Sequence, residues 1–280
     1  MHLRFVDRFH QPSNILIGIR ALFDILHQLT HLMTAYLIFS KTNYVAVSRV
    51  FWMLLIPAIG MMFGTFLTFV IGLDRLLAVL FPKFYWKIKS SKYIGLIFFF
   101  GGIYIIGLFT ATYYFDKDVQ TLIVVNPGSI FYGPSEILFI VSQVIFISLA
   151  ILVYILIWII AFFAVKSKPI NIRLLKPITV ILIFIVIGWV FNLVYGMYLK
   201  TIDLQTSDEE AYVINHMYAG ISINLGVASD YFVYFIFSKD YRTAFHKQLG
   251  IFRTKSTIHS NLNPEIQDRN KIHVAVCTAG

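Results

Sequence analysis

Four polar side chains interrupt the first long apolar segment of the chain. Arg20, Asp24, His27 and His31 follow one another at spacings of four, three and four residues, which places all four on one stripe of an α-helix. One interpretation is a satisfied polar seam, with Arg20 extending toward the cytoplasmic side. The other makes Asp24 an ion- or water-binding switch inside a helical bundle. Two histidines without a further ligand do not complete a zinc site.

Two further polar pairs lie toward the ends of apolar segments. Asp74 and Arg75 shortly precede Pro82. They are either an anchored terminal pair or a latch that opens toward a cytoplasmic partner, because Arg75 can reach that end of the helix. Asp230 and Tyr234 are four residues apart and share a helical face. The sequence shows no His-rich metal pattern and no Ser/Lys pair at matched depth, so neither an enzyme nor a bound cofactor is expected.

Composition identifies the elements that must carry these residues. Hydrophobic residues make up 58% of the 280 residues and charged residues only 13%, about half of the charge that a soluble domain needs. A membrane-spanning helix requires about 20 mostly apolar residues, and strand-type alternation is absent. We therefore predict an all-α membrane bundle over residues 15–238. The predicted spans are 15–40, 50–81, 93–115, 137–165, 177–199 and 212–238.

Loop charges orient this bundle. Basic residues gather in the loops 82–92 and 166–176 and after residue 238, whereas acidic residues, including Asp116 and Asp118, follow the third and fifth spans. The positive-inside rule places the basic loops in the cytoplasm, so the net charge of +9 does not indicate nucleic-acid binding. With six spans, both ends of the chain are expected inside. Residues 1–14 form a cytoplasmic segment, 239–252 an amphipathic helix on the inner leaflet, and 253–280 a disordered tail.

The order of the polar groups resembles that of a rhodopsin-like G-protein-coupled receptor. The segment 72–82, Gly-Leu-Asp-Arg-Leu-Leu-Ala-Val-Leu-Phe-Pro, is similar to the corresponding segment of nematode serpentine chemoreceptors of the Srsx class. Residues 14–19, Gly188–Trp189 and residues 238–242 also resemble that class, and the similarity covers residues 12–252. Such receptors have seven helices. The sequence begins where their first cytoplasmic loop should be, so the family's first helix is expected to be missing.

The resemblance implies roles for individual residues. Asp74, Arg75 and Leu76 match the family's Asp/Glu-Arg-Tyr motif, which couples to the G protein, with Leu76 in place of tyrosine. Asp24 matches the acidic residue of the family's sodium pocket. The other activation-switch residues are Trp189, which matches the toggle tryptophan, and Asp230 and Tyr234, which match the Asn/Asp-Pro-x-x-Tyr motif.

The sequence also departs from the family pattern. Phe191 stands where a proline usually follows the toggle tryptophan, and Tyr231 replaces the proline of the last motif. The family's disulfide to the second extracellular loop cannot form, because Cys277 is the only cysteine. These departures predict a divergent receptor.

The function implied by the resemblance is chemosensory signalling at the plasma membrane, for which the cilia of sensory neurons are a candidate location. A small-molecule or peptide ligand would bind within the bundle and activate a heterotrimeric G protein, with the lipid bilayer but no nucleic acid as a further partner. Candidate ligand-binding residues are Met61, Asn192, Tyr195 and Asn224. The alternative is a small transporter or channel using Asp24 and His27 for proton coupling. The sequence lacks the inverted repeat common in transporters, and an electrophysiological current would favour this alternative.

Overall fold

The computed structural model describes residues 12–42, 44–85, 87–164, 172–203 and 221–248. These belong to two compact units, Met1–Ser229 and Asp230–Gly280, which are described separately below. The predicted tail at 253–280, the first nine residues of the predicted last span and most of the predicted N-terminal segment lie outside the described residues.

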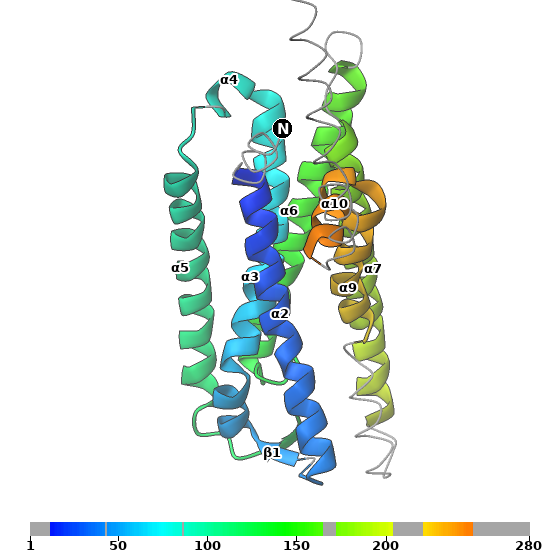
Figure 1. Ribbon diagram of the computed structural model, residues 1–280. Coiled ribbons are helices and arrows are strands. Elements are labelled where there is room, and N and C mark those ends of the chain that lie inside the picture. Colours follow the sequence, from blue (N-terminus) through cyan, green and yellow to red (C-terminus); the bar gives the residue numbers. More distant parts are fainter. Residues whose placement is uncertain (1–11, 43, 86, 165–171, 204–220, 249–280) are drawn as a thin grey trace, which may run out of the picture. The chain divides into compact units, whose positions relative to one another are not determined.

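Long apolar helices build the first unit. Within the described residues, five helices have the length and composition to cross a membrane. They are α2 (Pro12–Phe39), α3 (Val47–Leu80), α5 (Ser90–Asp116), α6 (Pro134–Ala164) and α7 (Ile172–Asp203), labelled in Figure 1. A shorter apolar helix, α9 (Ile221–Phe237), begins in the first unit and ends in the second. The prediction of an all-α membrane bundle is confirmed.

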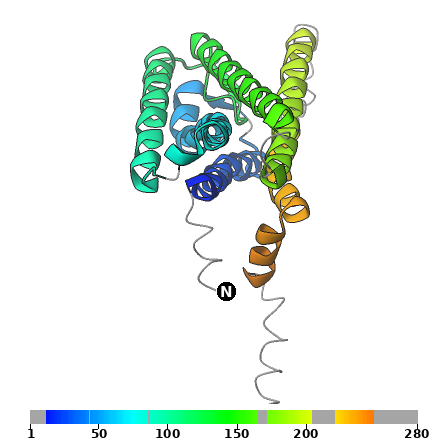
Figure 2. The same cartoon turned by 90° about the horizontal axis from the view of Figure 1, so that it is seen from above.

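Helix α3 is the central helix of the first unit. It packs against α2, α5 and α6, and Figure 2 shows it lying between these three. Every residue from Gly60 to Thr68 is buried, so neighbours surround this part of α3 on all sides. The peripheral helices instead turn large apolar side chains outward, such as Phe99 and Phe100 of α5 and Phe162 of α6. An outward apolar surface of this kind suits contact with lipid.

Two glycines allow α2 and α3 to approach closely. A Cβ atom at Gly60 would lie 2.5 Å from the backbone nitrogen of His27, and one at Gly64 would lie 3.2 Å from Oδ1 of Asp24. This spacing of small residues one turn apart is typical of tightly packed membrane helices. The polar stripe of α2 is therefore pressed against α3.

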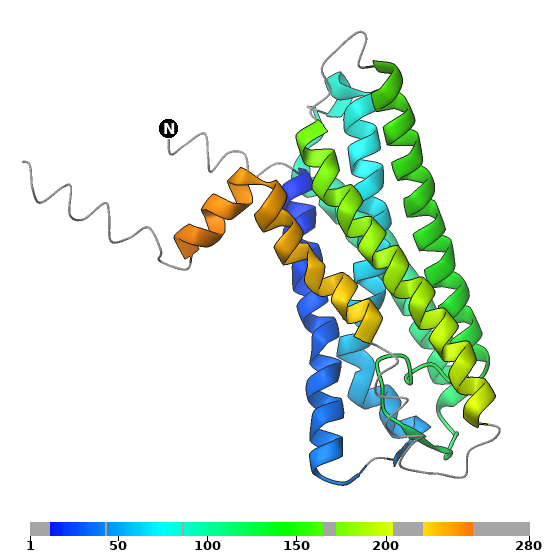
Figure 3. The same ribbon diagram turned by 90° about the vertical axis from the view of Figure 1, so that its right-hand side faces the viewer.

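Short elements occupy two regions that were predicted as loops. The predicted loop 82–92 contains a one-turn helix, α4 (Pro82–Tyr85). Two strands, β1 (Tyr44–Ala46) and β2 (Leu122–Val124), pair antiparallel, with Val45 opposite Ile123. Figure 3 shows the connection from β2 to α6 at the same end of the bundle as β1. Three residues are too few for a strand to show alternation in a sequence, so these two strands could not be predicted from it.

Asp116 also differs from its prediction as a loop residue. It is the last residue of α5, and only 2% of it is exposed. Its carboxylate accepts hydrogen bonds from Ser135 Oγ at 2.8 Å and from the backbone nitrogen of Tyr132 at 3.3 Å. It therefore joins the end of α5 to the start of α6, whereas Asp118 is exposed.

In the second unit, α10 (Lys239–Gln248) follows α9. The ring centroids of Tyr241 and Phe245 on α10 lie 4.8 Å and 4.6 Å from those of Tyr234 and Tyr231, respectively. An aromatic face of α10 thus packs on the last turns of α9. The position of this helix on the inner leaflet remains a prediction, and residues 249–252 of the predicted helix lie outside the described part of the chain.

Candidate functional site

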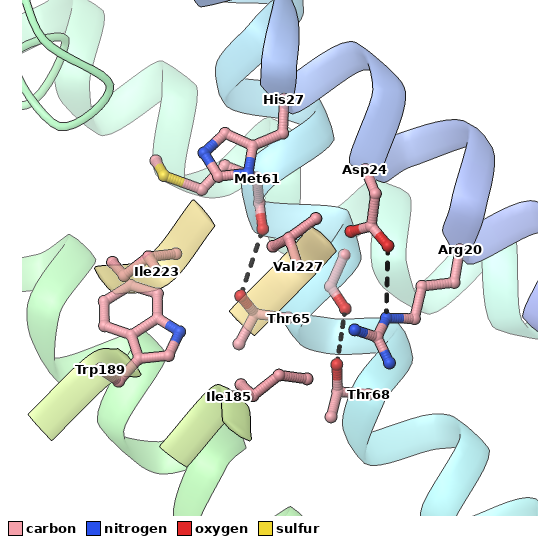
Figure 4. Close-up of a pocket in the computed structure, with 11 residues that line it drawn as sticks. Arg20, Asp24, His27, Met61, Thr65, Thr68, Ile185, Trp189, Ile223 and Val227 are labelled. Carbon is pink, nitrogen blue, oxygen red and sulfur yellow. Dashed lines mark hydrogen bonds and ion pairs between the residues drawn. The ribbon is translucent and has the colours of Figure 1, made fainter. Parts of the chain in front are cut away.

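A small internal cavity lies among α2, α3, α7 and α9. Its volume is about 30 Å³, which is room for a single water molecule. Figure 4 shows the side chains of Arg20 and Asp24 on one side of it and Trp189 on the other. The described residues that line it are Arg20, Asp24, His27, Met61, Gly64, Thr65, Thr68, Ile185, Trp189, Ile223 and Val227.

Arg20 and Asp24 form an ion pair beside this cavity. Arg20 Nε lies 3.7 Å from Asp24 Oδ2, and the exposed fractions of the two side chains are 7% and 15%. The Arg20 side chain is therefore buried inside the bundle, as the interpretation of a polar seam requires, while its extension toward the cytoplasmic side remains a prediction. Removing one partner of such a buried pair typically costs about 3–5 kcal/mol, since the other charge is left uncompensated.

A larger cavity is bounded in part by the connection after β2. Its volume is about 110 Å³. Three of the four predicted ligand-binding residues, Met61, Asn192 and Asn224, line it. Tyr195 is not part of this lining, and its ring centroid lies 6.3 Å from that of Phe191 along α7. The remaining lining residues are His27, Asn126, Pro127, Gly128, Phe139, Trp189 and Ile223.

Side-chain amides give the larger cavity its polar character. Gln28 Nε2 donates a 3.0 Å hydrogen bond to Asn224 Oδ1, and Asn126 Oδ1 accepts one of 2.9 Å from the backbone nitrogen of Gly128. These bonds orient two of the amides. The described lining holds no Asp, Glu, Lys or Arg, so it suits a neutral ligand with hydrogen-bonding groups. Asn126 and Gln28 were absent from the sequence-based prediction.

Trp189 belongs to both cavities, together with His27, Met61 and Ile223. The neighbouring residue Gly188 brings α7 against α9, because a Cβ atom there would lie 2.7 Å from the backbone oxygen of Ser222. Ser222 Oγ also donates a 3.1 Å hydrogen bond to the Gly188 carbonyl oxygen. A displacement of α7 at Trp189 would therefore move α9 directly.

Asp74 is fully buried and is held by hydroxyl groups from other elements. Ser13 Oγ donates to its Oδ2 at 2.8 Å, and the Tyr85 hydroxyl donates to its Oδ1 at 2.9 Å. The Tyr93 side chain is a third hydrogen-bond partner. Burial, and then the negative charge of Asp74, raises the pKa of Tyr85 to about 12, so its hydroxyl remains a donor at neutral pH. The sequence singled out Asp74 but none of these partners.

Arg75 is buried one residue further along α3. It is 9% exposed, and among the described residues its Nε and Nη2 atoms have no hydrogen-bond partner. The sequence-based expectation that Arg75 reaches the cytoplasmic end of the bundle remains a prediction. Buried donors without acceptors are unfavourable, so the guanidinium would gain free energy from any conformation that provides one.

Leu76, which stands in place of the family's tyrosine, has an apolar environment. It packs with Phe69 against Val153 and Ile157 of α6. Gly72, one turn earlier, faces the same helix, because a Cβ atom there would lie 2.9 Å from the Tyr154 ring. Leu76 thus contributes to the contact between α3 and α6.

Asp230 and Tyr234 belong to the second unit. The Tyr234 side chain is buried and contacts the Tyr241 ring. Because Asp24 lies in the first unit, the expectation that Asp24 and Asp230 face each other remains a prediction.

Comparison with known proteins places the chain in a family. Residues 3–249 match the sequence profile of the family described as serpentine type 7TM GPCR chemoreceptor Srsx. A comparison with curated proteins found no match. The profile spans the polar stripe of α2, the Asp74–Arg75 segment, the described lining of both cavities and all of α10. The chain is therefore a multi-pass membrane protein that belongs to the Srsx family of serpentine chemoreceptors.

Proposed function

We propose that the protein is a plasma-membrane receptor that binds a small molecule in the larger cavity and activates a cytoplasmic heterotrimeric G protein. The observation that carries this proposal is the sharing of Trp189, Met61, His27 and Ile223 between the larger cavity and the smaller polar cavity. A ligand in one cavity would touch residues that also bound the other. The cilia of sensory neurons are a proposed location.

The lining of the larger cavity favours one of the two ligand classes. About 110 Å³ is far below the roughly 300–1,000 Å³ of pockets for drug-sized ligands, so a small molecule suits it better than a peptide. Amide groups at Asn126, Asn192 and Asn224 offer both donors and acceptors, while Phe139 and Trp189 offer apolar contacts. The proposed ligand is a small neutral molecule with one or two hydrogen-bonding groups.

Signalling would proceed by a shift between conformations. A ligand that contacts Trp189 more favourably when α7 is displaced stabilises that conformation. The backbone contact between Gly188 and Ser222 would pass the displacement to α9. An opening of the Asp74 end would give the Arg75 guanidinium a hydrogen-bonding partner on the G protein. That contact must differ between the two states, because an equal contact shifts no equilibrium.

The test is a G-protein activation assay in cells that express the full chain, screened with small neutral organic molecules. Asn192→Leu removes an amide from the cavity and should raise the half-maximal ligand concentration at least tenfold, as expected for the loss of about 1.4 kcal/mol. Tyr198→Phe is the matched control on the same helix, because Tyr198 is 57% exposed and outside the lining. A ligand-evoked current that persists without a G protein would contradict the proposal and support a transporter or channel.

A further inference from the structure

The family's pocket implies a sodium ion beside Asp24, and the residues present do not fit one. We propose that the Arg20 guanidinium takes the position of that cation, so that the core of this receptor carries its own fixed positive charge and binds no sodium. Figure 4 shows the Nε atom of the guanidinium facing the Asp24 carboxylate at the edge of the smaller cavity, with the two terminal nitrogens on the far side. The distance from Arg20 Nε to Asp24 Oδ2 is 3.7 Å.

Charge is the first reason that sodium does not fit. A cation that bound the carboxylate of Asp24 would lie within a few ångströms of the Arg20 guanidinium, and arginine stays protonated in proteins. Both side chains are largely shielded from solvent, so water would screen the repulsion poorly. Among the described residues of the lining, only Arg20 and Asp24 carry a formal charge. The pair is therefore neutral as it stands, and an added ion would leave it with an excess positive charge.

Space is the second reason. The cavity of about 30 Å³ accommodates one water molecule, whereas hard cations require about six oxygen ligands. On the α3 side, a Cβ atom at Gly64 would already lie 3.2 Å from Asp24 Oδ1. The hydroxyls of Thr65 and Thr68 donate to carbonyl oxygens of their own helix at 3.2 Å and 3.0 Å. Their oxygen atoms keep free lone pairs, but with the two carboxylate oxygens of Asp24 the described lining offers only four side-chain oxygens, fewer than the roughly six that a hard cation requires. The cavity also has too little room for a hydrated ion.

A built-in cation changes what can regulate the receptor. A mobile ion that binds one conformation stabilises it in proportion to its concentration, but a side chain of the same charge has a constant effect. The stability of this protein should therefore not depend on whether the salt is sodium or potassium. Replacement of Arg20 by a neutral residue of similar length should expose the Asp24 carboxylate to cations.

The experiment measures thermal unfolding of the full chain in lipid nanodiscs, in sodium chloride and in potassium chloride at equal ionic strength. The wild type should unfold at the same temperature in both salts. Arg20→Gln should show a saturable rise of the unfolding temperature in sodium, and this rise should be absent from the double variant with Asp24→Asn. Arg20→Lys retains the positive charge and is the matched control, with no response to sodium expected.

Two results would overturn the proposal. The first is a saturable sodium response in the wild type that Asp24→Asn removes. The second is a folded Arg20→Gln variant that responds no more to sodium than the wild type does. Should Arg20→Gln not fold, the binding of radioactive sodium to the wild type is measured instead. Stoichiometric binding that requires Asp24 would contradict the proposal, and the absence of such binding would support it. The assays need neither ligand nor G protein, so their outcome is independent of the proposed signalling function.

Discussion

Ser13 Oγ donates a 2.8 Å hydrogen bond to Asp74 Oδ2 across a sequence separation of 61 residues. This bond joins the first turn of α2 to the buried carboxylate near the end of α3. A hydrogen bond to a charged group contributes about 1.5–3 kcal/mol to stability. Ser13→Ala should therefore lower the free energy of unfolding by about that amount, measured by chemical denaturation in detergent. Ser91→Ala, at an exposed serine in the first turn of α5, is the control, and equal losses in both variants would contradict the role of Ser13.

Tyr85 predicts a loss of stability in alkaline solution. Burial and the charge of Asp74 raise the pKa of its hydroxyl from 10.0 to about 12, so the folded protein favours the protonated form. The stabilisation is fully present below the unfolded-state pKa of about 10 and is lost as the pH rises through the folded-state value. Tyr85→Phe should remove this part of the loss of stability, which is measured as the free energy of unfolding at a series of alkaline pH values. Tyr36→Phe, at a residue 68% exposed, is the control. If the free energy of unfolding falls equally steeply with pH in Tyr85→Phe and in the wild type, Tyr85 contributes nothing to the loss.

Gly60 should not tolerate even a methyl group. Its Cβ position lies 2.5 Å from the α2 backbone, and a backbone atom cannot move aside without separating the two helices. Gly60→Ala should destabilise the protein by about 1–3 kcal/mol, as overpacking generally does. Gly107→Ala, in open space on α5, should be neutral or stabilising by up to about 1 kcal/mol, because alanine favours helix. Thermal unfolding of the two variants tests this contrast, which similar unfolding temperatures would refute.

Arg75 should be required for signalling and dispensable for folding. Its buried Nε and Nη2 atoms have no hydrogen-bond partner among the described residues, so Arg75→Ala removes an unfavourable burial together with the charge. Surface expression and unfolding temperature should stay near those of the wild type, while ligand-dependent G-protein activation should be lost. Exposed Arg242→Ala on α10 controls for the general loss of a basic residue. Normal signalling by Arg75→Ala would exclude this role.

Asp24 and Asp230 should be energetically coupled. Two carboxylates that share a polar core, linked by polar atoms or water, do not contribute independently. The double variant Asp24→Asn/Asp230→Asn should therefore differ in unfolding free energy from the sum of the single variants by at least about 0.5 kcal/mol. The control cycle pairs Asp24→Asn with Asp118→Asn, because the Asp118 side chain is 90% exposed. Additive effects in both cycles would mean that Asp24 and Asp230 do not face each other.

The sequence alone determined the class of the protein. Transfer of a helical segment into lipid depends on the summed hydrophobicity of about 20 consecutive residues. The spans that form α2, α3, α5, α6 and α7 could therefore be found without knowing which helices pack against them. Helical periodicity likewise placed Arg20, Asp24 and His27 on one face of α2, and these three residues line a single cavity. The close approach of α2 and α3 at Gly60 and Gly64 was not predicted from the sequence, because two small residues on one helix do not identify the helix that packs against them.

Only the tertiary structure decided how the polar groups are paired. Asp74 bonds to Ser13 and Tyr85 on other elements, whereas helical periodicity brings together only residues of one helix, such as Arg20 and Asp24. Asn126, in the connection after β2, likewise joins Asn192 and Asn224 around one cavity. The physical reason is that a buried polar group takes whichever partner packing brings within about 3 Å. Helix packing brings together residues that can be far apart in the chain, and neither hydropathy nor periodicity carries that information.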